Sequence, residues 1–193
     1  MLLTIRPLSE PSRLREIYRL RVTAWEHSTG GTVINHDLFP DGWTDELDED
    51  ARHWTVTDDT GRIVASARLN IFDHPEQFPD YRSLLTLPVP SETPFAFCSR
   101  LVVHPSYRGR GLSTGLLRER LAYCEAHGVA WASAYVTLHS VKAKLREEGF
   151  GAIGEIDVRY HQDTPTHKVE VFGKRLAPVR TGRPAMETEC AFV

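Results

Sequence analysis

Cysteine is scarce in this chain, and its spacing excludes two kinds of small protein. The 193 residues include three cysteines, Cys98, Cys124 and Cys190, without a C-x-x-C pair. An odd and widely spaced set of this kind indicates neither a disulfide framework nor a structural zinc site. The nine histidines include no H-E-x-x-H pattern, so we expect reduced thiols and no metal.

Long apolar runs and long basic runs are also missing. No segment approaches the ~20 apolar residues needed to span a bilayer, and the segment from Met1 to Glu10 lacks the apolar core of a signal peptide. The net charge is −3, and no long cluster of cations offers a surface for a nucleic-acid backbone. We therefore expect a cytoplasmic protein that has neither a membrane nor a nucleic acid as its partner.

Length and composition favour a single domain. With 193 residues, 41% of them hydrophobic, the chain is long enough for one well-buried core and short for two. We expect residues 1–176 to form this domain and residues 177–193 to form a disordered tail.

The most informative segment runs from Leu101 to His127, where a strand, a glycine- and arginine-rich loop and an amphipathic helix are predicted in succession. Gly109 and Gly111 carry no Cβ, so backbone N–H groups can close around an anion at the positive end of the helix. Five arginines and one glutamate lie between residues 100 and 120, a local charge of +4 in a chain of net negative charge. This segment is therefore predicted to bind an anion.

Two kinds of phosphate-binding loop do not fit the spacing. The phosphate-binding loop of nucleoside triphosphatases requires a Lys-Ser or Lys-Thr after its glycines, and this chain has neither there. Thr114 stands where a dinucleotide-binding fingerprint has its third glycine. A structural alternative stays open, in which the glycines soften a strand-to-helix turn and the two arginines are solvated.

The remaining pattern, Arg108-x-x-Gly111-x-Ser113 after a strand that ends in Val-Val-His-Pro, resembles the acyl-CoA loop of the GNAT N-acyltransferase superfamily, Q/R-x-x-G-x-G/A. Ser113 departs from the usual small residue at the last position. The resemblance implies acetyl-CoA or another acyl-CoA as cosubstrate. The positions that would bind it are Leu101, Val102, Val103, Arg108, Gly109, Arg110, Gly111, Leu112, Ser113 and Thr114.

The predicted order of elements is similar to the fold of the same superfamily. Strands are expected at 2–7, 53–57, 63–71, 95–103, 130–136, 154–160 and 168–176, and helices at 11–25, 113–127 and 138–148. A loop with at most one short helical piece is expected at 30–50. Five prolines between Asp73 and Pro94 are spaced too closely for a helix or an interior strand, so an ordered loop over one face of the sheet is expected there. The implied fold class is α/β, with a mixed, mostly antiparallel central sheet and helices on both faces.

The N-terminal half also resembles the acyl-homoserine lactone synthases, which make bacterial autoinducers. The matching residues are Arg21, Trp25, Asp45, Asp48, Arg68 and the pair Ser99-Arg100. The resemblance implies a substrate-binding role for the first five. A salt-bridge network among the charged members, with Trp25 as a core anchor, is the structural alternative. The family's usual carboxylate is replaced by Phe97-Cys98, and the well-formed loop favours coenzyme A over an acyl carrier protein as donor.

The implied reaction is the attack of an amine on a thioester. Residues 95–103 contain no acidic residue to act as base, and Leu145 replaces the tyrosine that often serves as general acid. Deprotonating an α-amine at neutral pH costs only about 1 pKa unit against about 3 to 4 for a lysine amine. We therefore expect a small amino-acid-like acceptor whose carboxylate meets Arg68 or Arg100. The candidate catalytic residues are Arg100, Ser99, Glu26, Tyr135 and His139.

Two further hypotheses accompany this one. The proline-rich segment could wall a tunnel for a medium or long acyl chain, as in an autoinducer synthase or an N-acyl amino acid synthase. The missing tyrosine and carboxylate would also suit a CoA-binding sensor without catalysis. The family resemblance makes a homodimer possible.

Overall fold

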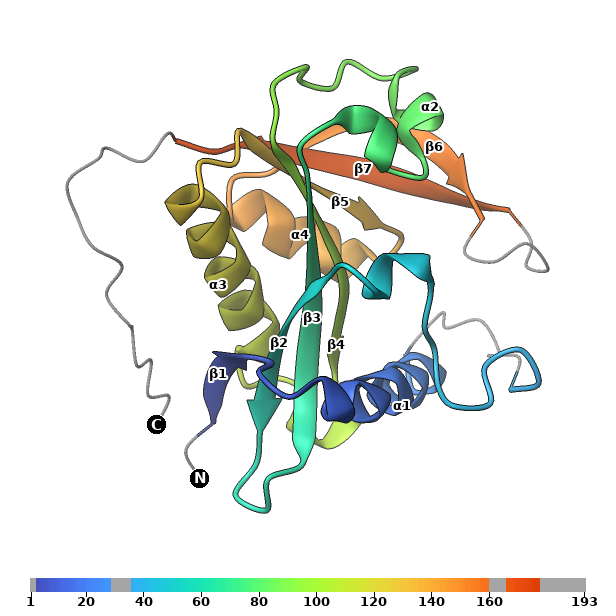
Figure 1. The fold of residues 1–193 in the computed structure, drawn as a ribbon, viewed down its shortest axis with the longest axis vertical. Coiled ribbons are helices and arrows are strands. Elements are labelled where there is room, and N and C mark those ends of the chain that lie inside the picture. Colours follow the sequence, from blue (N-terminus) through green and yellow to red (C-terminus); the bar gives the residue numbers. More distant parts are fainter. Residues whose placement is uncertain (1–2, 29–35, 160–165, 178–193) are drawn as a thin grey trace. The chain divides into compact units, whose positions relative to one another are not determined.

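The structure is a computed structural model that describes residues 3–28, 36–159 and 166–177 (Figure 1). Within these residues, seven strands form one sheet in the order β1-β2-β3-β4-β5-β7-β6. The strands are β1 (Thr4–Pro7), β2 (Arg52–Thr57), β3 (Ile63–Phe72), β4 (Phe95–Val103), β5 (Trp131–Val136), β6 (Gly151–Val158) and β7 (His167–Arg175). The helices are α1 (Leu14–Glu26), α2 (Tyr81–Leu84), α3 (Leu112–Ala126) and α4 (His139–Glu147). Single 3-10 turns are η1 (Pro11–Arg13), η2 (Glu46–Asp48), η3 (Pro75–Gln77) and η4 (Pro105–Tyr107).

The predicted fold class is confirmed. β4 and β5 pair in parallel, whereas β1 with β2, β5 with β7 and β6 with β7 pair antiparallel, so the sheet is mixed and mostly antiparallel. β4 has the predicted bounds, and the other strands and longer helices lie within a few residues of theirs. The predicted tail lies outside the described residues except for position 177.

Contacts within the chain divide it into two compact units. Among the described residues, unit 1 comprises those up to Arg68 and Arg100–Arg120, and unit 2 comprises Leu69–Ser99 and those from Leu121 onward. β3, β4 and α3 each contribute residues to both units. The expectation of one domain over residues 1–176 stays a prediction.

Unit 1 is organised around the apolar stripe of α1. Ile17 and Leu20 are buried against Ile63 at the start of β3, and Val102 near the end of β4 packs on the same cluster. α1 accordingly runs beside these two strand ends (Figure 1). Proline in the first turn of η1 suits a helix start, because its missing N–H would have no partner there.

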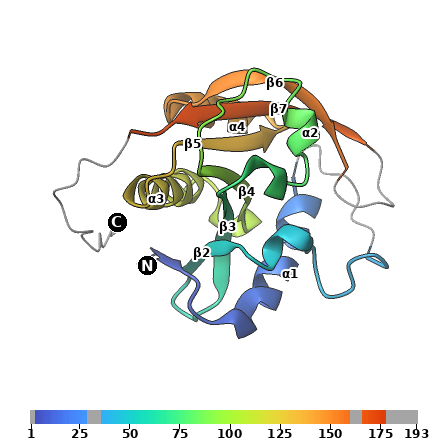
Figure 2. The ribbon, with the colours of Figure 1, turned by 45° about the horizontal axis from the view of Figure 1, so that its top comes forward.

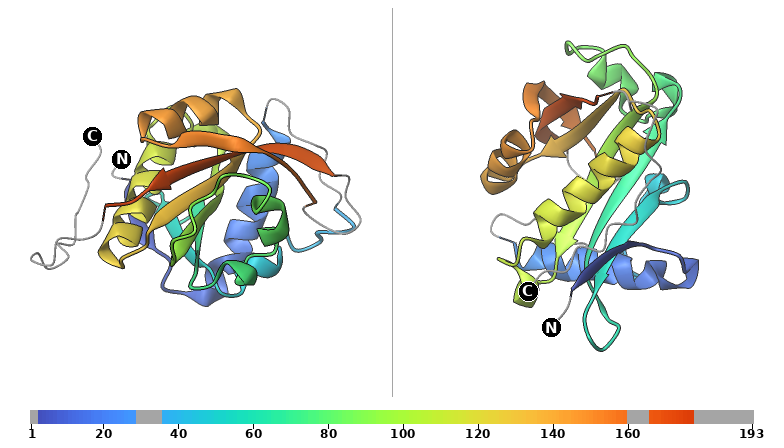
Figure 3. Two further views of the ribbon diagram at one scale, coloured as in Figure 1. Left: turned by 90° about the horizontal axis from the view of Figure 1, so that it is seen from above. Right: turned by 90° about the vertical axis from the view of Figure 1, so that its left-hand side faces the viewer.

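Unit 2 is organised around β5, β7 and β6. The three strands lie side by side with α4 along them (Figures 2 and 3). Lys142 of α4 pairs with Glu170 of β7 at 2.5 Å, and Arg146 lies over the Phe172 ring at 5.2 Å. Aromatic side chains fill the core, with Phe95 stacked on Trp131 at a centroid distance of 5.1 Å.

The proline-rich segment corrects one prediction. It is ordered, as expected, but it contains η3 and the four-residue helix α2, although the prolines were expected to exclude any helix. Pro75 occupies the first turn of η3, where proline is tolerated, and the gap between Pro79 and Pro88 has room for one turn. α2 contacts β6, and a Cβ at Gly154 of β6 would lie 2.5 Å from the Leu87 side chain.

None of the helices in the described part of the chain is both long and apolar enough to cross a membrane. Nor do residues 3–28, 36–159 and 166–177 contain a group of three or more His, Cys, Asp or Glu side chains placed to hold a metal ion.

Candidate functional site

The loop between β4 and α3 has the backbone that an anion-binding turn needs. Gly109 and Gly111 have φ values of +78° and +73°, in the left-handed region that side chains disfavour. A Cβ built on either glycine would meet no atom within 4 Å, so both face open space. The first helical hydrogen bond of α3 runs from Gly115 N to Gly111 O at 3.0 Å. The N–H groups in the first turn of an α-helix have no carbonyl acceptor within the helix, and helices bind anions at this end.

The two arginines of this loop have different partners. Arg108 donates to the carbonyl oxygens of Ala24 at 2.7 Å and His27 at 2.8 Å, and its Nε lies 3.4 Å from Val103 O. These carbonyls include the C-terminal end of α1, where a cation complements the helix dipole. In this structure Arg108 ties the loop to α1, and its predicted role as a cosubstrate ligand stays a prediction.

Arg110 lies over an aromatic ring. Its Cζ is 5.1 Å from the centroid of Tyr107, and the Tyr107 hydroxyl donates to Asp58 Oδ2 at 2.9 Å. Hydrogen bonds from Thr60 and from Tyr107, aided by backbone N–H groups, lower the pKa of Asp58 to about 2. The same hydrogen bond from its own hydroxyl raises the pKa of Tyr107.

A second arginine-rich region, the buried arginine cluster, consists of Arg21, Arg68, Arg100, Asp45 and Asp48. Arg21 donates to both carboxylate oxygens of Asp48 at 2.7 Å. Arg68 pairs with Asp45 and lies 3.0 Å from Asp48. Arg100 donates through Nε to Asp45 at 3.0 Å. Only 1% and 2% of the Arg21 and Arg68 side chains are exposed, against 10% for Arg100.

The D-x-x-D spacing explains how the loop presents both carboxylates. Asp45 is the N-cap of η2, and its side chain accepts the N–H of Leu47 at 3.1 Å. Asp48 returns the interaction by accepting the N–H of Asp45 at 3.1 Å. This reciprocal capping box fixes the two carboxylates relative to each other. The short helical piece expected in residues 30–50 is therefore present.

Electrostatics keep both aspartates of the buried arginine cluster charged. Burial alone would raise the pKa of Asp48, but the hydrogen bonds and charge of Arg21, with the charge of Arg68, hold it well below its usual range. Burial likewise opposes the charges of Arg100 and Arg68 at Asp45, whose pKa is lowered. His53, with Nε2 3.7 Å from Asp48, has its pKa lowered to about 4 by burial and by the charge of Arg21.

Trp43 contacts both Trp25, the aromatic residue expected at this site, and Arg100 of the buried arginine cluster. The guanidinium of Arg100 lies 4.1 Å from the Trp43 ring centroid, and the Trp25 ring meets Trp43 edge-on at 5.2 Å. Sequence reasoning found Trp25 and Arg100 but missed Trp43 and His53. The sequence feature that could have indicated Trp43 is its position two residues before Asp45.

The remaining catalytic candidates lie on other elements. Glu26, at the end of α1, pairs with His36 at 2.7 Å. Tyr135 of β5 packs edge-on against Phe97 at 4.7 Å. His139 is exposed at the start of α4, and Ser99 is half-buried in β4. The roles proposed for these residues stay predictions.

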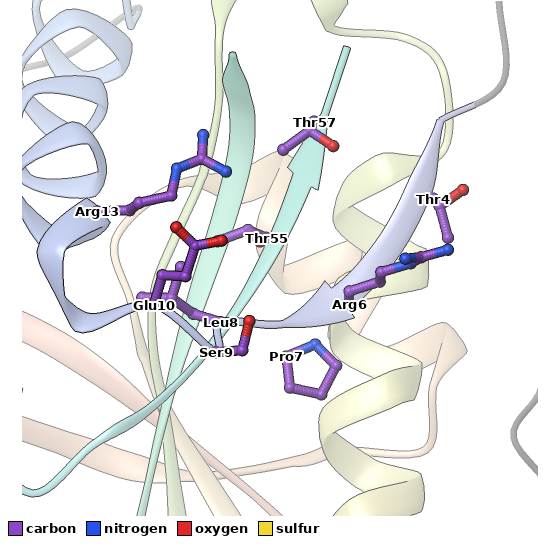
Figure 4. A pocket seen from close by; sticks show the side chains of 9 residues that line it. All are labelled: Thr4, Arg6, Pro7, Leu8, Ser9, Glu10, Arg13, Thr55 and Thr57. Carbon is purple, nitrogen blue, oxygen red and sulfur yellow. The ribbon is translucent and has the colours of Figure 1, made fainter. Parts of the chain in front are cut away.

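A polar cavity of about 220 Å³ lies beside β1, β2 and η1 (Figure 4). Cross-strand pairing places Thr4 opposite Thr57 and Arg6 opposite Thr55. The residues that line the cavity are Thr4, Arg6, Pro7, Leu8, Ser9, Glu10, Arg13, Thr55 and Thr57. None of the site residues expected from the sequence lines this cavity.

Comparison with known proteins identifies the family. Residues 14–152 match the Acetyltransferase (GNAT) family, well over half of the chain, and the chain belongs to this family. It is therefore an acyltransferase enzyme. No protein with a curated description matches the sequence.

Solved structures share the fold at low identity. The ribosomal-protein-S18-alanine N-acetyltransferase of Escherichia coli is 18% identical with a TM-score of 0.60, over 95% of this chain and 99% of that one. A phosphinothricin acetyltransferase of Sinorhizobium meliloti, in complex with AcCoA, is 19% identical with a TM-score of 0.58, over 97% and 95%. An N-acetyltransferase of Staphylococcus aureus is 16% identical with a TM-score of 0.60, over 91% and 99%. These matches do not test the resemblance to acyl-homoserine lactone synthases, which stays a prediction.

Proposed function

We propose that this enzyme transfers an acetyl group from acetyl-CoA to the α-amine of a small amino-acid-like acceptor. The observation that carries the proposal is the loop before α3, where Gly109 and Gly111 adopt left-handed backbone with open space in place of a Cβ. The diphosphate of a CoA thioester fits such a turn, because N–H groups and the helix dipole favour negative charge there.

The reaction is a direct transfer. The amine nitrogen attacks the thioester carbon, the C–S bond breaks, the departing thiolate takes up a proton, and the amine releases one to water or to a modest base such as Glu26 or His139. Backbone N–H groups of Leu101 to Val103 would face the thioester carbonyl and stabilise its oxyanion, and such a donor is worth about 3 kcal/mol.

Arg100 is the arginine of the buried arginine cluster best suited to an acceptor's carboxylate. Its side chain is 10% exposed, whereas Arg21 and Arg68 are almost fully enclosed by their carboxylate partners. The Trp43 ring under the guanidinium would orient its plane toward a bidentate ligand. Arg21 and Arg68 would then act by holding Asp45 and Asp48 in place.

A second candidate function is that of an autoinducer-synthase-like or N-acyl amino acid synthase that uses a medium or long acyl chain. It is favoured by the gathering of Arg21, Asp45, Asp48, Arg68 and Arg100 into one cluster. Preference for a long-chain over an acetyl donor would separate the two functions.

The experiment is a mass-spectrometric screen of acyl-CoA chain lengths against a pool of amino acids. We expect an N-acetylated amino acid with acetyl-CoA. A product formed only with longer chains selects the second candidate. Binding of CoA without any acylated product would support a sensor instead, and absence of CoA binding by calorimetry would refute all three.

A matched pair of glycine variants tests the loop itself. Gly111→Ala and Gly128→Ala place a side chain at similar φ values, +73° and +68°, at the two ends of α3. Both substitutions cost about 1 to 2 kcal/mol of backbone strain, so we expect similar losses of thermal stability. Only Gly111→Ala should raise the KM for acetyl-CoA, because its Cβ would occupy the space proposed for the diphosphate. Equal KM values in the two variants would contradict the proposed position.

A further inference from the structure

The polar cavity beside β1, β2 and η1 has opposite charges at its two sides. Figure 4 shows the Glu10 carboxylate on the side of Arg13 and the Arg6 guanidinium on the other side, next to Thr4, with the Ser9 hydroxyl between them. Within the described residues, the side chains of Arg6 and Glu10 make no hydrogen bond or ion pair. One cation and one anion of the cavity are therefore available to a ligand.

The register of the two strands gathers polar side chains on the cavity's face of the sheet. Thr4 pairs with Thr57, and Arg6 pairs with Thr55. Because alternate residues of a strand point to the same face, these four side chains share one face, whereas the fully buried Val56 points to the other. Thr55 is only 6% exposed, so the cavity combines a buried hydroxyl with charged groups nearer the solvent.

Hydrogen bonds hold the frame of the cavity in place. Arg13 donates to the two carboxylate oxygens of Glu16 at 2.7 and 2.8 Å and to Gly61 O at 2.7 Å. The N–H of Leu8 donates to His53 O at 2.7 Å, which extends the pairing of β1 with β2 toward η1. A site that is already in its final shape loses little conformational freedom when it binds a ligand.

The charges and the size of the cavity indicate the class of ligand. Glu16 compensates Arg13, so Arg6 and Glu10 leave one positive and one negative charge. Glu10 would repel a simple anion, and Arg6 would repel a simple cation. The volume of about 220 Å³ exceeds the ~150 Å³ in which a protein cavity binds benzene, so there is room for roughly six to eight non-hydrogen atoms.

We propose that this cavity binds a small zwitterion with an ammonium group at one end, held by Glu10, and a carboxylate at the other, held by Arg6. It is a second binding site, separate from acyl transfer, because none of the residues proposed for that reaction lines it. Since the ligand would bridge Arg6 of β1 and Glu10 at the start of η1, its binding should raise the thermal stability of the chain.

Calorimetric titration of the full chain with γ-aminobutyrate, in the absence of CoA, tests the proposal. We expect binding, and we expect glycine, whose charges are adjacent, to bind about tenfold more weakly. Arg6→Gln and Glu10→Gln should each weaken γ-aminobutyrate binding by about tenfold. Arg15→Gln and Glu147→Gln, exposed changes of equal charge on α1 and α4, are the matched controls and should keep the wild-type affinity.

Two truncated ligands test which charge meets which residue. γ-Aminobutyramide lacks the carboxylate, so Arg6→Gln should bind it as well as the wild type does. N-acetyl-γ-aminobutyrate lacks the ammonium group, so Glu10→Gln should likewise match the wild type. A tenfold loss for γ-aminobutyramide in Arg6→Gln, equal to that for γ-aminobutyrate, would contradict the proposed orientation, because the interaction would not involve the carboxylate.

Other outcomes would refute the site as a whole. These are no heat with γ-aminobutyrate in the wild type, glycine binding as tightly as γ-aminobutyrate, or γ-aminobutyrate affinity that neither Arg6→Gln nor Glu10→Gln changes. Without γ-aminobutyrate, both variants should keep the wild-type KM and kcat for acyl transfer, and a raised acceptor KM would assign the cavity to the reaction instead. Failure of the chain to bind CoA would refute the proposed function and leave this inference standing.

Discussion

The buried arginine cluster and the loop before α3 are both rich in arginine, yet they hold their cations in opposite ways. In the cluster, Arg21, Arg68 and Arg100 meet the carboxylates of Asp45 and Asp48, and the first two side chains are almost fully buried. In the loop, Arg108 and Arg110 are exposed and meet carbonyls and a ring.

Solvent access explains the difference. A guanidinium that is buried away from water needs opposite charges and hydrogen bonds to offset its lost hydration. Removing one member of the cluster would therefore leave its partners buried with an uncompensated charge. An exposed arginine keeps its hydration and depends little on protein partners. The loop can therefore offer a cation to a ligand, whereas most of the cluster cannot.

Removing a carboxylate from the cluster should have the largest effect. Asp48→Asn keeps the side-chain shape but removes the charge that compensates Arg21 and Arg68. We expect the free energy of unfolding to fall by about 3 to 5 kcal/mol, measured by urea denaturation. The exposed Asp50→Asn should stay within about 0.5 kcal/mol of wild type. A loss below 1 kcal/mol for Asp48→Asn would mean that water reaches Arg21, and the contrast between the two regions would fail.

Acidic pH should destabilise the cluster through His53. Its pKa is lowered from 6.5 to about 4 in the folded chain, so between these values the unfolded chain binds a proton that the folded chain does not. Stability should therefore decrease as the pH falls from 6.5 to 4, by about 3 kcal/mol in total. Asp48, with its lowered pKa, stays ionised in both states over most of this range and contributes below it.

Denaturation curves at several pH values for wild type and His53→Gln measure this contribution. The variant should have a flatter dependence between pH 6.5 and 4, whereas His127→Gln, at an exposed position, should keep the wild-type slope. Parallel curves for wild type and His53→Gln would exclude His53 as the origin.

Arg100 links the cluster to β4, and its backbone allows a smaller and sharper test. It has φ +50°, in the left-handed region, the one such non-glycine residue in the described part of the chain. Arg100→Gly and Arg100→Ala both remove the guanidinium, but glycine relieves the strain, so it should be the more stable by about 1 kcal/mol. At Val102, where φ is ordinary, alanine should be the more stable of the same pair.

Kinetics of the two Arg100 variants separate function from strain. If Arg100 binds the acceptor's carboxylate, both variants should raise the acceptor KM equally, because both lack the guanidinium. An acceptor KM that follows backbone stability instead would assign Arg100 to the fold.

Much of the fold follows from local patterns. The β-rich run of residues 95–103 predicted the bounds of β4. In α1, the buried residues Ile17, Leu20 and Ala24 recur at the spacing of one helical face. The helix α2 was missed because proline content was read as excluding any helix, whereas it excludes only positions that need the missing N–H.

The site was predictable only in part. The left-handed glycines of the loop and the capping box of Asp45 and Asp48 depend on backbone geometry within a few residues, and the sequence indicated both groups of residues. Trp43 and His53 were missed because neither belongs to a short motif, and each gains its place only when residues 43–53 pack beside Arg100 and Arg21.

The sequence by itself determined where the loop before α3 needs left-handed glycine and, to within a few residues, where the longer helices lie, since both depend on neighbours a few positions away. Only the tertiary structure decided which groups each arginine contacts. Arg108 finds the carbonyl of Ala24 across 84 positions of the chain, and Arg100 finds Asp45 across 55. Such partners depend on how distant segments pack and on how much water the packing removes, and neither is written in the local order of residues.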